Sequence, residues 1–370
     1  DEYLIGENIN ASYKHIMYAN KLFNAMLKGK CKVTHNFYLK LWHLSKPDLS
    51  DFDMIAIDEF QDNSGALLDI VDRNSDNDSK IIVIGDTNQS IYQFNHSVNG
   101  LEILNDGWKN YPLTKSFRVG NTLAKVMETS FSRLLGTDLK IEGYNKTQKV
   151  VKNIDRDKKH WVISRYNSTI FRECIDYTQM GKKVYIHSTR ANFDFKYLQN
   201  LYRFKFYGDK HFTFKKYEDY NEMVKEAEKT DNRSFLSMDK LMSEYGTSFI
   251  YKINDMKDLT VDSPDKADVC YVTAHSSKGM TIKDPVRLTT DFPDLLKPQD
   301  FDILPEINLF YVANSRCSGD IELPDSLLSM YLNDFESPIT RRIDREFRKI
   351  TNHEIKKLKS EINDCTNEAL

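Results

Sequence analysis

The stretch FDMIAIDEF (Phe52–Phe60) decides the fold class, because a run of apolar residues ends there directly in acidic side chains. A second run of the same kind, KIIVIGD (Lys80–Asp86), follows it, and the helix-length stretch Ser64–Asp72 separates the two. Strands that look continuously apolar are typical of parallel sheets covered on both faces. A strand–helix–strand order is typical of α/β domains. The sequence therefore predicts an α/β fold built on buried parallel strands.

The same order of elements returns in the second half of the chain. Strands are predicted in HWVISRY (160–166), KVYIHS (183–188) and DVCYVTAH (268–275), and helices at 121–135, 168–179 and 305–314. Apolar spacing also predicts a helix within 1–30, a short strand start followed by a helix in 32–42, and a helix after Pro338. We therefore expect two α/β domains in tandem. The first covers 1–114, the second covers 115–204 and 266–335, a mainly helical insertion covers 205–265, and a basic helical tail covers 336–370.

Composition excludes several classes of protein. Of the 370 residues 40% are apolar and 29% are charged, which is typical of globular chains and not of disordered ones. No apolar run approaches the ~20 residues of a membrane span. The five cysteines are far apart and form no Cys-x-x-Cys pair, which argues against a disulfide scaffold and favours a reducing compartment such as cytosol or nucleus. The net charge of −3 still permits a local basic groove for nucleic acid.

The strongest local motif is IAIDEFQD, Ile55–Asp62. A buried strand that delivers Asp58 and Glu59 at its carboxyl end is typical of nucleotide hydrolases, in which one carboxylate binds Mg²⁺ and the next polarises the attacking water. The alternative is a strand that ends in solvated acidic residues. The Asp-Glu pair by itself does not separate these readings.

Further motifs follow in a fixed order: GDTNQSIYQF (85–94), LTKSFR (113–118), VISRYN (162–167), VTAHSSKG (272–279) and NLFYVANSRC (308–317). Together with IAIDEFQD they resemble motifs II, III, IV, IVa, V and VI of UvrD/Rep-type superfamily 1 helicases. The resemblance extends from about residue 33 to residue 323 and is closest to the F-box DNA helicase branch. It implies two RecA-like domains.

The resemblance assigns a set of residues to ATP and Mg²⁺. Asp58 would bind the metal and Glu59 would activate water, while Gln89, Arg118 and Arg316 would contact the γ-phosphate. The nucleotide would be bound further by Phe117, stacked on the base, and by Lys278 and Gly279 of motif V. Without the motif around it, Arg118 would be interpreted as a surface arginine in a turn. For Phe117 the alternative is a core phenylalanine.

The resemblance assigns a second set to single-stranded DNA. Tyr92 and Phe94 would stack on bases, which is a sequence-tolerant contact. The remaining positions would contact the DNA backbone: Thr34, His35, Arg165, Asn167, Thr273 and His275. His35 alone also reads as a partly buried histidine without a DNA contact.

The sequence departs from the family in one large respect. No Gly-x-x-x-x-Gly-Lys-Ser/Thr loop, the phosphate cradle of such enzymes, is present in the 370 residues. Because the chain starts at Asp1 and not at Met, we expect it to be the downstream part of a longer or split helicase, inactive in hydrolysis by itself. The alternative is a degenerate relative that has lost hydrolysis.

The resulting functional hypothesis is an ATP-dependent 3′–5′ DNA helicase or translocase of replication, recombination or repair. Its expected partners are single-stranded DNA, an upstream fragment that carries the phosphate loop, and replication or recombination proteins, with no membrane. The alternative is a non-hydrolysing single-strand-binding or regulatory remnant. The Lys-, Asn- and Ile-rich composition is compatible with a viral origin, which would place the protein in the host cytoplasm. The basic tail either binds phosphates or a partner protein, or is a solvated helix face.

Overall fold

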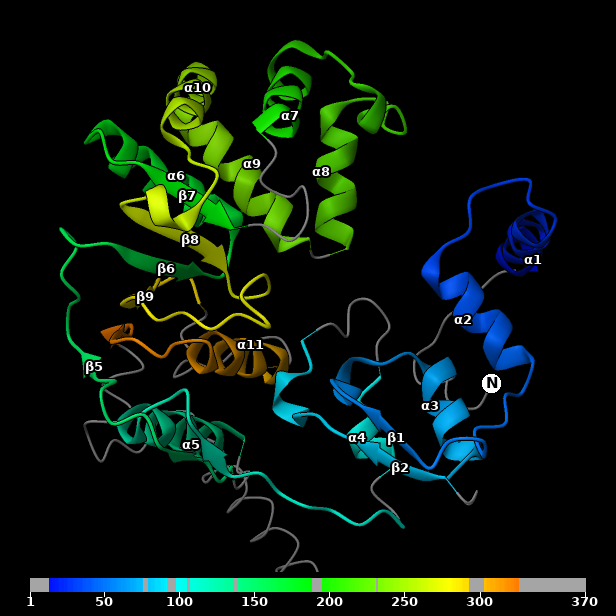
Figure 1. Ribbon diagram of the computed structural model, residues 1–370. Coiled ribbons are helices and arrows are strands. Elements are labelled where there is room, and N and C mark those ends of the chain that lie inside the picture. The colour runs from blue at the N-terminus through cyan, green and yellow to red at the C-terminus, as the bar shows by residue number, and fades with distance from the viewer. Residues whose placement is uncertain are drawn as a thin grey trace, which may run out of the picture. The chain divides into compact units, whose positions relative to one another are not determined.

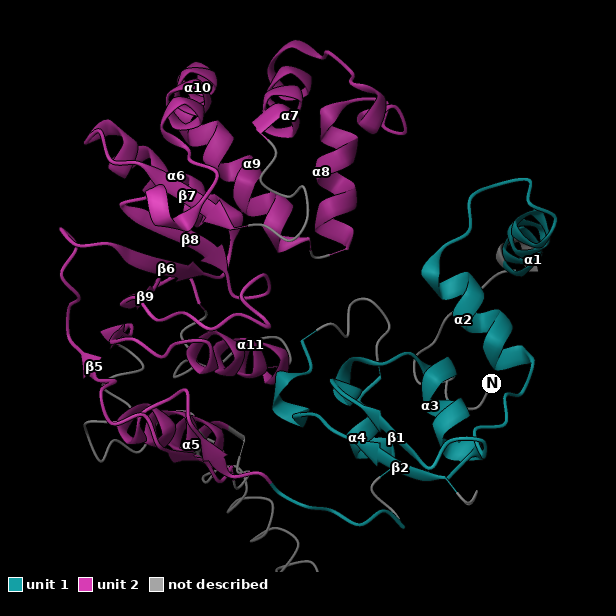
Figure 2. Cartoon of the chain, viewed as in Figure 1, with its two compact units in different colours: residues 1–112 teal, residues 113–370 magenta. Residues whose placement is uncertain are grey.

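The computed structural model describes residues 13–75, 79–91, 98–104, 107–135, 139–187, 195–230, 232–292 and 303–325. These residues form two compact units, with the division between Pro112 and Leu113 (Figure 2). Each unit is an α/β arrangement with parallel strands, so the predicted fold class is confirmed. Among the described residues, no helix is long and apolar enough to cross a membrane.

Unit 1 contains a two-stranded parallel sheet of β1 (Met54–Ile57) and β2 (Lys80–Val83). Its helices are α1 (Tyr13–Leu27), α2 (His35–Leu44), α3 (Gly65–Arg73) and α4 (Gly100–Ile103). The register pairs Ile57 with Val83, so both strands end at the same edge. This edge carries the predicted acidic residues.

The strand start expected within residues 32–42 is wrong. Thr34 is instead the N-cap of α2, and its Oγ1 accepts a hydrogen bond from the Phe37 backbone N–H at 3.3 Å. A threonine hydroxyl that satisfies an otherwise unpaired amide stabilises a helix start by about 1 kcal/mol. The helix cap at Thr34 therefore outweighs the β preference of the residues that precede Thr34.

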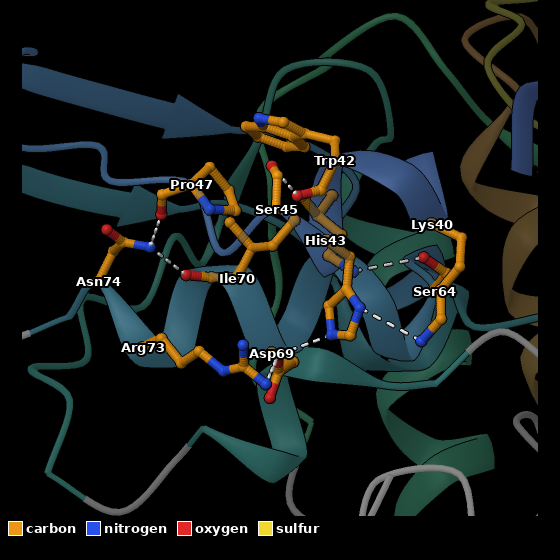
Figure 3. Close-up of polar contacts among 11 residues, drawn as sticks. Lys40, Trp42, His43, Ser45, Pro47, Ser64, Asp69, Ile70, Arg73 and Asn74 are labelled. Atoms are coloured by element: carbon orange, nitrogen blue, oxygen red, sulfur yellow. Dashed lines mark hydrogen bonds and ion pairs between the residues drawn. The ribbon is translucent and has the colours of Figure 1, made fainter. Parts of the chain in front are cut away.

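Polar contacts fix α2 and the following loop against α3 (Figure 3). His43 Nε2 lies 2.7 Å from Asp69 Oδ2, and Arg73 binds the same carboxylate at 2.6 Å. Asn74 at the end of α3 donates to the Pro47 carbonyl at 3.1 Å and accepts from the Leu49 amide at 3.0 Å. The loop therefore enters β1 in a defined position.

Unit 2 contains a six-stranded, all-parallel sheet in the order β5-β10-β9-β6-β8-β7. The strands are β5 (Val150–Val151), β6 (His160–Ser164), β7 (Val184–His187), β8 (Val269–Thr273), β9 (Val286–Leu288) and β10 (Ile321–Glu322). A separate two-stranded pair joins β3 (Lys115–Ser116) to β4 (Glu142–Gly143). All five residues of β6 are buried, as expected of a central strand with neighbours on both sides.

Unit 2 also contains helices (Figure 1). They are α5 (Asn121–Leu135), α6 (Asn167–Gln179), α7 (Phe195–Tyr207), α8 (Tyr220–Lys229), α9 (Arg233–Tyr245), α10 (Phe249–Leu259) and α11 (Leu304–Ser315). Of these, α6 packs on the sheet at β6, β7 and β8. Figure 1 shows α6, α9 and α10 gathered beside β7 and β8. The helical run between β7 and β8 begins at Phe195, upstream of the expected start of the insertion at residue 205. One apolar core joins α6 and the helices α7, α8, α9 and α10, which we call the helical cluster, to β6, β7 and β8.

Phe249 links the helical cluster to α6 and thus to the sheet. Its ring is fully buried and stacks on Phe171 of α6, with 4.7 Å between the ring centroids. We expect Phe249→Ala to lower the free energy of unfolding by about 3–5 kcal/mol, since it removes a whole buried ring and leaves a cavity. Urea unfolding followed by circular dichroism measures this change. Tyr251→Ala is the control, because Tyr251 lies on the same helix and is 68% exposed. Equal losses in both variants would contradict the packing described here.

Candidate nucleotide and nucleic-acid sites

The carboxyl edge of the unit 1 sheet brings together three of the predicted catalytic residues. Asp58 and Glu59 follow β1, and Gln89 ends the 3₁₀ turn Thr87–Gln89 that follows β2. Asp58 Oδ1 accepts a hydrogen bond from the Glu59 backbone N–H at 2.8 Å. Glu59 has a φ of 52°, which is uncommon for a residue other than glycine. The chain therefore turns sharply at the acidic pair.

Two residues that sequence reasoning missed, Gln61 and Asp86, connect these side chains. The buried Gln61 amide donates to the Glu59 carboxylate, and its Oε1 accepts from the Asp86 backbone N–H at 3.1 Å. Asp86 Oδ2 in turn accepts from Gln89 Nε2 at 2.9 Å. The result is a polar chain from Glu59 through Gln61 and Asp86 to Gln89. Both missed residues stand inside the quoted motifs, but only the fold shows that Gln61 and Asp86 lie next to each other.

Gly85 makes this chain fit. A Cβ at this position would lie 2.3 Å from Gln61 Oε1 and 3.1 Å from the Phe60 backbone nitrogen. Such a contact is sterically forbidden, so any larger residue would displace the Gln61 amide. Glycine is required here for close approach and not for an unusual φ.

The donor set at this edge suits Mg²⁺ bound through few protein ligands. Within the described parts of the chain, no three His, Cys, Asp or Glu side chains form a group that could hold a metal ion. Mg²⁺ usually keeps several waters and takes one or two carboxylates together with substrate phosphates. The exposed Asp58 carboxylate at the strand end fits that mode of binding.

Unit 2 brings the two predicted phosphate arginines together at the end of α11. Arg118 donates from a terminal guanidinium nitrogen to the Ser315 carbonyl at 2.9 Å. Arg316 donates to Ser315 Oγ at 2.7 Å and to the Val312 carbonyl at 3.1 Å. Arg316 is buried and Arg118 is half-buried, so both guanidinium groups are held in place by backbone and hydroxyl acceptors.

Two amide side chains hold the arginine segments against each other. Asn145 Nδ2 donates to the Arg118 carbonyl at 2.9 Å and to the Ser318 carbonyl at 2.8 Å. Gln148 Nε2 donates to the Cys317 carbonyl at 2.6 Å, and Gln148 Oε1 accepts from the Gly120 amide. Sequence reasoning missed both, because amides that bond to distant backbone have no local sequence signal.

Phe117 is not a core residue. Its ring is 79% exposed and its nearest aromatic neighbour is Tyr144, with 5.5 Å between centroids. An exposed large ring next to a held arginine has a free face on which a flat base can stack.

The carboxyl edge of the unit 2 sheet carries four of the predicted DNA contacts. β6 and β8 are paired so that Ser164 lies opposite Thr273. Arg165 and Asn167 follow β6, and His275 follows β8. The strand register therefore brings these four side chains, including Thr273, to neighbouring loops.

Arg165 is bound by acidic residues in this structure. Its guanidinium donates to the Glu306 carboxylate through Nε at 2.9 Å and a terminal nitrogen at 2.8 Å. The Asp291 carboxylate accepts from the backbone N–H groups of Arg165 and Tyr166, both at 3.0 Å. A DNA phosphate would therefore have to share this guanidinium with Glu306. No pattern in the sequence pointed to Glu306 or Asp291, which are more than a hundred positions away along the chain.

His275 is held neutral in this setting. Burial lowers the pKa of its imidazole to about 4, and the positive charge of Arg165 contributes in the same direction. The turn that follows β8 is closed by the Thr273 hydroxyl, which accepts from the Ser276 amide at 3.2 Å. Lys278 and Gly279 complete the turn, and Gly279 adopts a φ of 84° that favours glycine.

The other predicted residues do not belong to the groups at the strand ends or at the end of α11. Thr34 caps α2, and His35 is exposed and paired with the Tyr38 hydroxyl. Tyr92, Phe94 and the basic tail lie outside the described residues.

Comparison with known proteins agrees with the motif order. Residues 24–106 match the UvrD/REP helicase N-terminal domain family. The chain is related to the UvrD/Rep-like superfamily 1 helicases. The F-box DNA helicase 1 of Gallus gallus is 27% identical over 340 residues, which cover 85% of this chain and 33% of the relative. The F-box DNA helicase protein 1 of Schizosaccharomyces pombe is 27% identical over 354 residues, which cover 86% of this chain and 39% of the relative.

This UvrD/Rep-like chain thus spans little more than a third of the curated relatives it matches. Among solved structures, S. cerevisiae Dbp5 bound to RNA and ADP BeF3 aligns over 86% of this chain and 68% of its own, with 12% identity and a TM-score of 0.27. A superposition this loose carries no information about function.

The pair of Arg165 and Glu306 gives a stability prediction. The two side chains are only 18% and 9% exposed, so removal of one leaves a poorly solvated charge. We expect Glu306→Ala to lower the free energy of unfolding by about 3 kcal/mol. The double replacement Arg165→Met with Glu306→Leu should recover most of that loss, because no unpaired charge remains. Chemical unfolding of the two variants and the parent chain tests this. A double variant no more stable than Glu306→Ala would contradict it.

His275 gives a pH prediction. In the unfolded chain the imidazole binds a proton as the pH falls below 6.5, whereas in the folded chain it does so only near 4. The stability that the neutral His275 imidazole contributes should therefore be present in full above pH 6.5, and it should fall as the pH drops between these two values. His275→Asn should reduce the loss of stability between neutral pH and about pH 5 by about 1–2 kcal/mol. Urea unfolding at the two pH values measures the difference. Buried His160 has a pKa shifted in the same direction, and His160→Asn serves as the comparison. An unchanged pH dependence in His275→Asn would refute the assignment.

Proposed function

We propose that this chain is the part of an ATP-dependent DNA translocase that lies downstream of the phosphate loop, moving 3′ to 5′ on single-stranded DNA. The observation that carries the proposal is the polar chain from Glu59 through Gln61 and Asp86 to Gln89 at the carboxyl edge of β1 and β2. The motif order and the names of the two relatives, both DNA helicases, support the same function.

In this proposal Glu59 polarises the attacking water. Its carboxylate is oriented by the Gln61 amide, and the buried Gln61 cannot move without disturbing Asp86 and Gln89. Gln89 therefore can report the state of the nucleotide phosphates to the acidic pair. Asp58 would hold Mg²⁺, which when bound neutralises developing charge on the phosphate oxygens.

Arg118 and Arg316 supply positive charge for the same step. Guanidinium groups that reach a γ-phosphate in the transition state contribute on the order of 10³-fold or more to hydrolysis. Both are oriented through Ser315, so a change at the end of α11 would act on the two together. Phe117 offers its exposed ring to the base.

For DNA, the proposed contacts are Arg165, Asn167, Thr273 and His275, with Tyr92 and Phe94 as stacking residues. A neutral imidazole such as that of His275 contacts a phosphate or sugar by hydrogen bonding and not by charge. Contacts of this kind position the strand without reading its sequence.

The sheet of unit 1 supports the proposal that a further segment completes the motor. Met54, Ile82 and Ile84 are 57%, 38% and 43% exposed, although parallel strands are normally covered on both faces. We propose that an upstream segment supplies both this cover and the missing phosphate loop. Replication or recombination proteins would act together with the assembled motor in the cytosol or nucleus.

Glu59→Gln tests the hydrolytic role. With the upstream segment supplied in trans, we expect the parent chain to hydrolyse ATP in a DNA-stimulated manner. Glu59→Gln should lower that rate by about 10²–10⁴-fold while DNA binding is retained, because the variant loses the water-activating carboxylate and keeps its size. Glu102→Gln is the matched control, since Glu102 is an exposed carboxylate of α4 in the same unit.

The second candidate function is a binding module without turnover, favoured by the absence of a phosphate loop from these residues. Parallel binding assays with a labelled ATP analogue and single-stranded DNA discriminate between the two. If the complemented chain binds DNA but never hydrolyses ATP, the motor proposal is wrong and the binding module remains.

A further inference from the structure

One face of α7 carries polar and aromatic residues that the proposed motor does not use. Lys196, Asn200, Arg203 and Tyr207 are three or four positions apart, so they share one face of the helix. The other side of α7 is buried in the core of the helical cluster through Leu198, Leu201, Tyr202 and Phe204. The helix therefore has one fixed inner side and one outer side open to a ligand.

The segment after α7 extends this outer side into a shallow hollow of about 340 Å³. Arg203 and Asn200 line it from the helix, and the following loop lines it with Asp209, Lys210, His211, Phe212 and Lys215. We name Arg203, Tyr207, Lys210, His211, Phe212 and Lys215 the basic–aromatic surface.

This surface carries a strong local positive charge. Residues 195–216 contain six basic residues (196, 203, 205, 210, 215 and 216) and one acidic residue, Asp209, a local charge of +5 in a chain whose net charge is −3. Lys205 and Lys216 are paired with Asp239 and Glu226. Among the residues that the structure describes, no carboxylate lies within ion-pair distance of Arg203, Lys210 or Lys215. Three exposed cations thus line the hollow beside one carboxylate, Asp209, which forms no ion pair with any of them.

Two large aromatic rings stand exposed beside these cations. Phe212 is 70% exposed and Tyr207 is 71% exposed. Exposed rings of this size cost solvation free energy unless a ligand covers them. Next to Phe212, the His211 ring lies 4.2 Å away between centroids and adds a further flat surface.

The loop that carries Phe212 is anchored to α7 by a buried aromatic contact. Phe214, two residues on, is buried and stacks on Phe204 of α7 at 5.3 Å with an angle of 7° between the rings. The 3₁₀ turn Phe212–Phe214 is closed by the Phe214 amide, which donates to the His211 carbonyl at 2.9 Å. The exposed ring is therefore presented by a fixed turn, which lowers the entropy lost on binding.

We propose that the basic–aromatic surface binds single-stranded nucleic acid, with Arg203, Lys210 and Lys215 on phosphates and Phe212 and Tyr207 stacked on unpaired bases. Alternating cations and exposed rings match a strand of regularly spaced phosphates and bases. Duplex ends offer few unstacked bases, and an acidic peptide would leave the two rings unused. The proposal rests on the proposed function in that the same strand would pass through the motor, but it assigns a separate contact.

The test is binding of fluorescein-labelled oligothymidylate to the full chain, without nucleotide, over a salt series. Lys210→Ala with Lys215→Ala should reduce the slope of log affinity against log salt by about 1.4, since each phosphate contact on a single strand accounts for about 0.7. Phe212→Ala should weaken binding about five- to a hundredfold with little change in salt slope, because it removes a stacked base. It should not unfold the chain, since the ring is exposed.

The matched control is Lys240→Ala with Lys257→Ala. These two exposed lysines lie on α9 and α10 of the same helical cluster and do not line the hollow. The control should keep the parent affinity and slope. Photo-crosslinking with 4-thiothymidine-substituted oligonucleotide should in addition label the peptide that contains Phe212.

Three results would overturn the proposal: unchanged affinity and slope in both surface variants, equal losses in the control, or crosslinks confined to other peptides. Tighter binding of duplex than of single strands, with the same variant losses, would refute the single-strand assignment. None of these results bears on ATP hydrolysis by the complemented chain, so failure of this proposal is distinguishable from failure of the motor proposal.

Discussion

Parallel pairing of strands is the constraint on which both units depend. Parallel neighbours all end at the same edge, so the loops that follow them are forced together whatever their separation along the chain. In unit 2 the pairing of Ser164 with Thr273 places the segment after β6 beside the segment after β8, about 110 positions later. In unit 1 the pairing of Ile57 with Val83 does the same for Asp58 and Asp86. The candidate residues from both units gather at these strand ends because the loops there are brought together by the sheet.

Charge at these edges has to be compensated by elements that come from elsewhere. Arg165 is held by Glu306 of α11 and, through its backbone, by Asp291, while Arg287 of β9 is paired with Glu173 of α6. A half-buried guanidinium without such a partner would cost several kcal/mol. Burial, with the positive charge of Arg165 as a smaller contribution, lowers the pKa of His275, so the loop after β6 carries a paired charge and the loop after β8 a neutral imidazole. The loop after β6 therefore carries a charge that is already paired within the protein. A ligand that binds there has to compete with this pair.

What could be predicted from sequence follows from how local each signal is. The elements that were predicted correctly include the strands β1, β2, β6, β7 and β8, and the helices α5, α6 and α11. Their apolar residues follow one another in the sequence, in continuous runs or with the period of a helix, so the signal is local. The strands β9 and β10 were missed, since they have three and two residues and carry Arg287 and Glu322, whose partners lie far away. Gln61, Asp86, Asn145 and Gln148 were missed for the same reason. Their roles depend on which backbone groups the fold brings near them, and no single position records that.

The two sheets also differ in how complete they are, and this difference bears on function. The six-stranded sheet of unit 2 buries every residue of β6, whereas both strands of unit 1 alternate between exposed and half-buried positions. The apolar core of unit 1 is small, with Phe60, Leu68, Val71 and Leu104 as its buried residues. The acidic pair and its polar chain are nevertheless fully formed at the edge of this small sheet. The ordered polar chain and the exposed apolar residues Met54, Ile82 and Ile84 belong to the same small sheet, and together they support the proposal that one further segment supplies both the phosphate loop and the cover of this sheet.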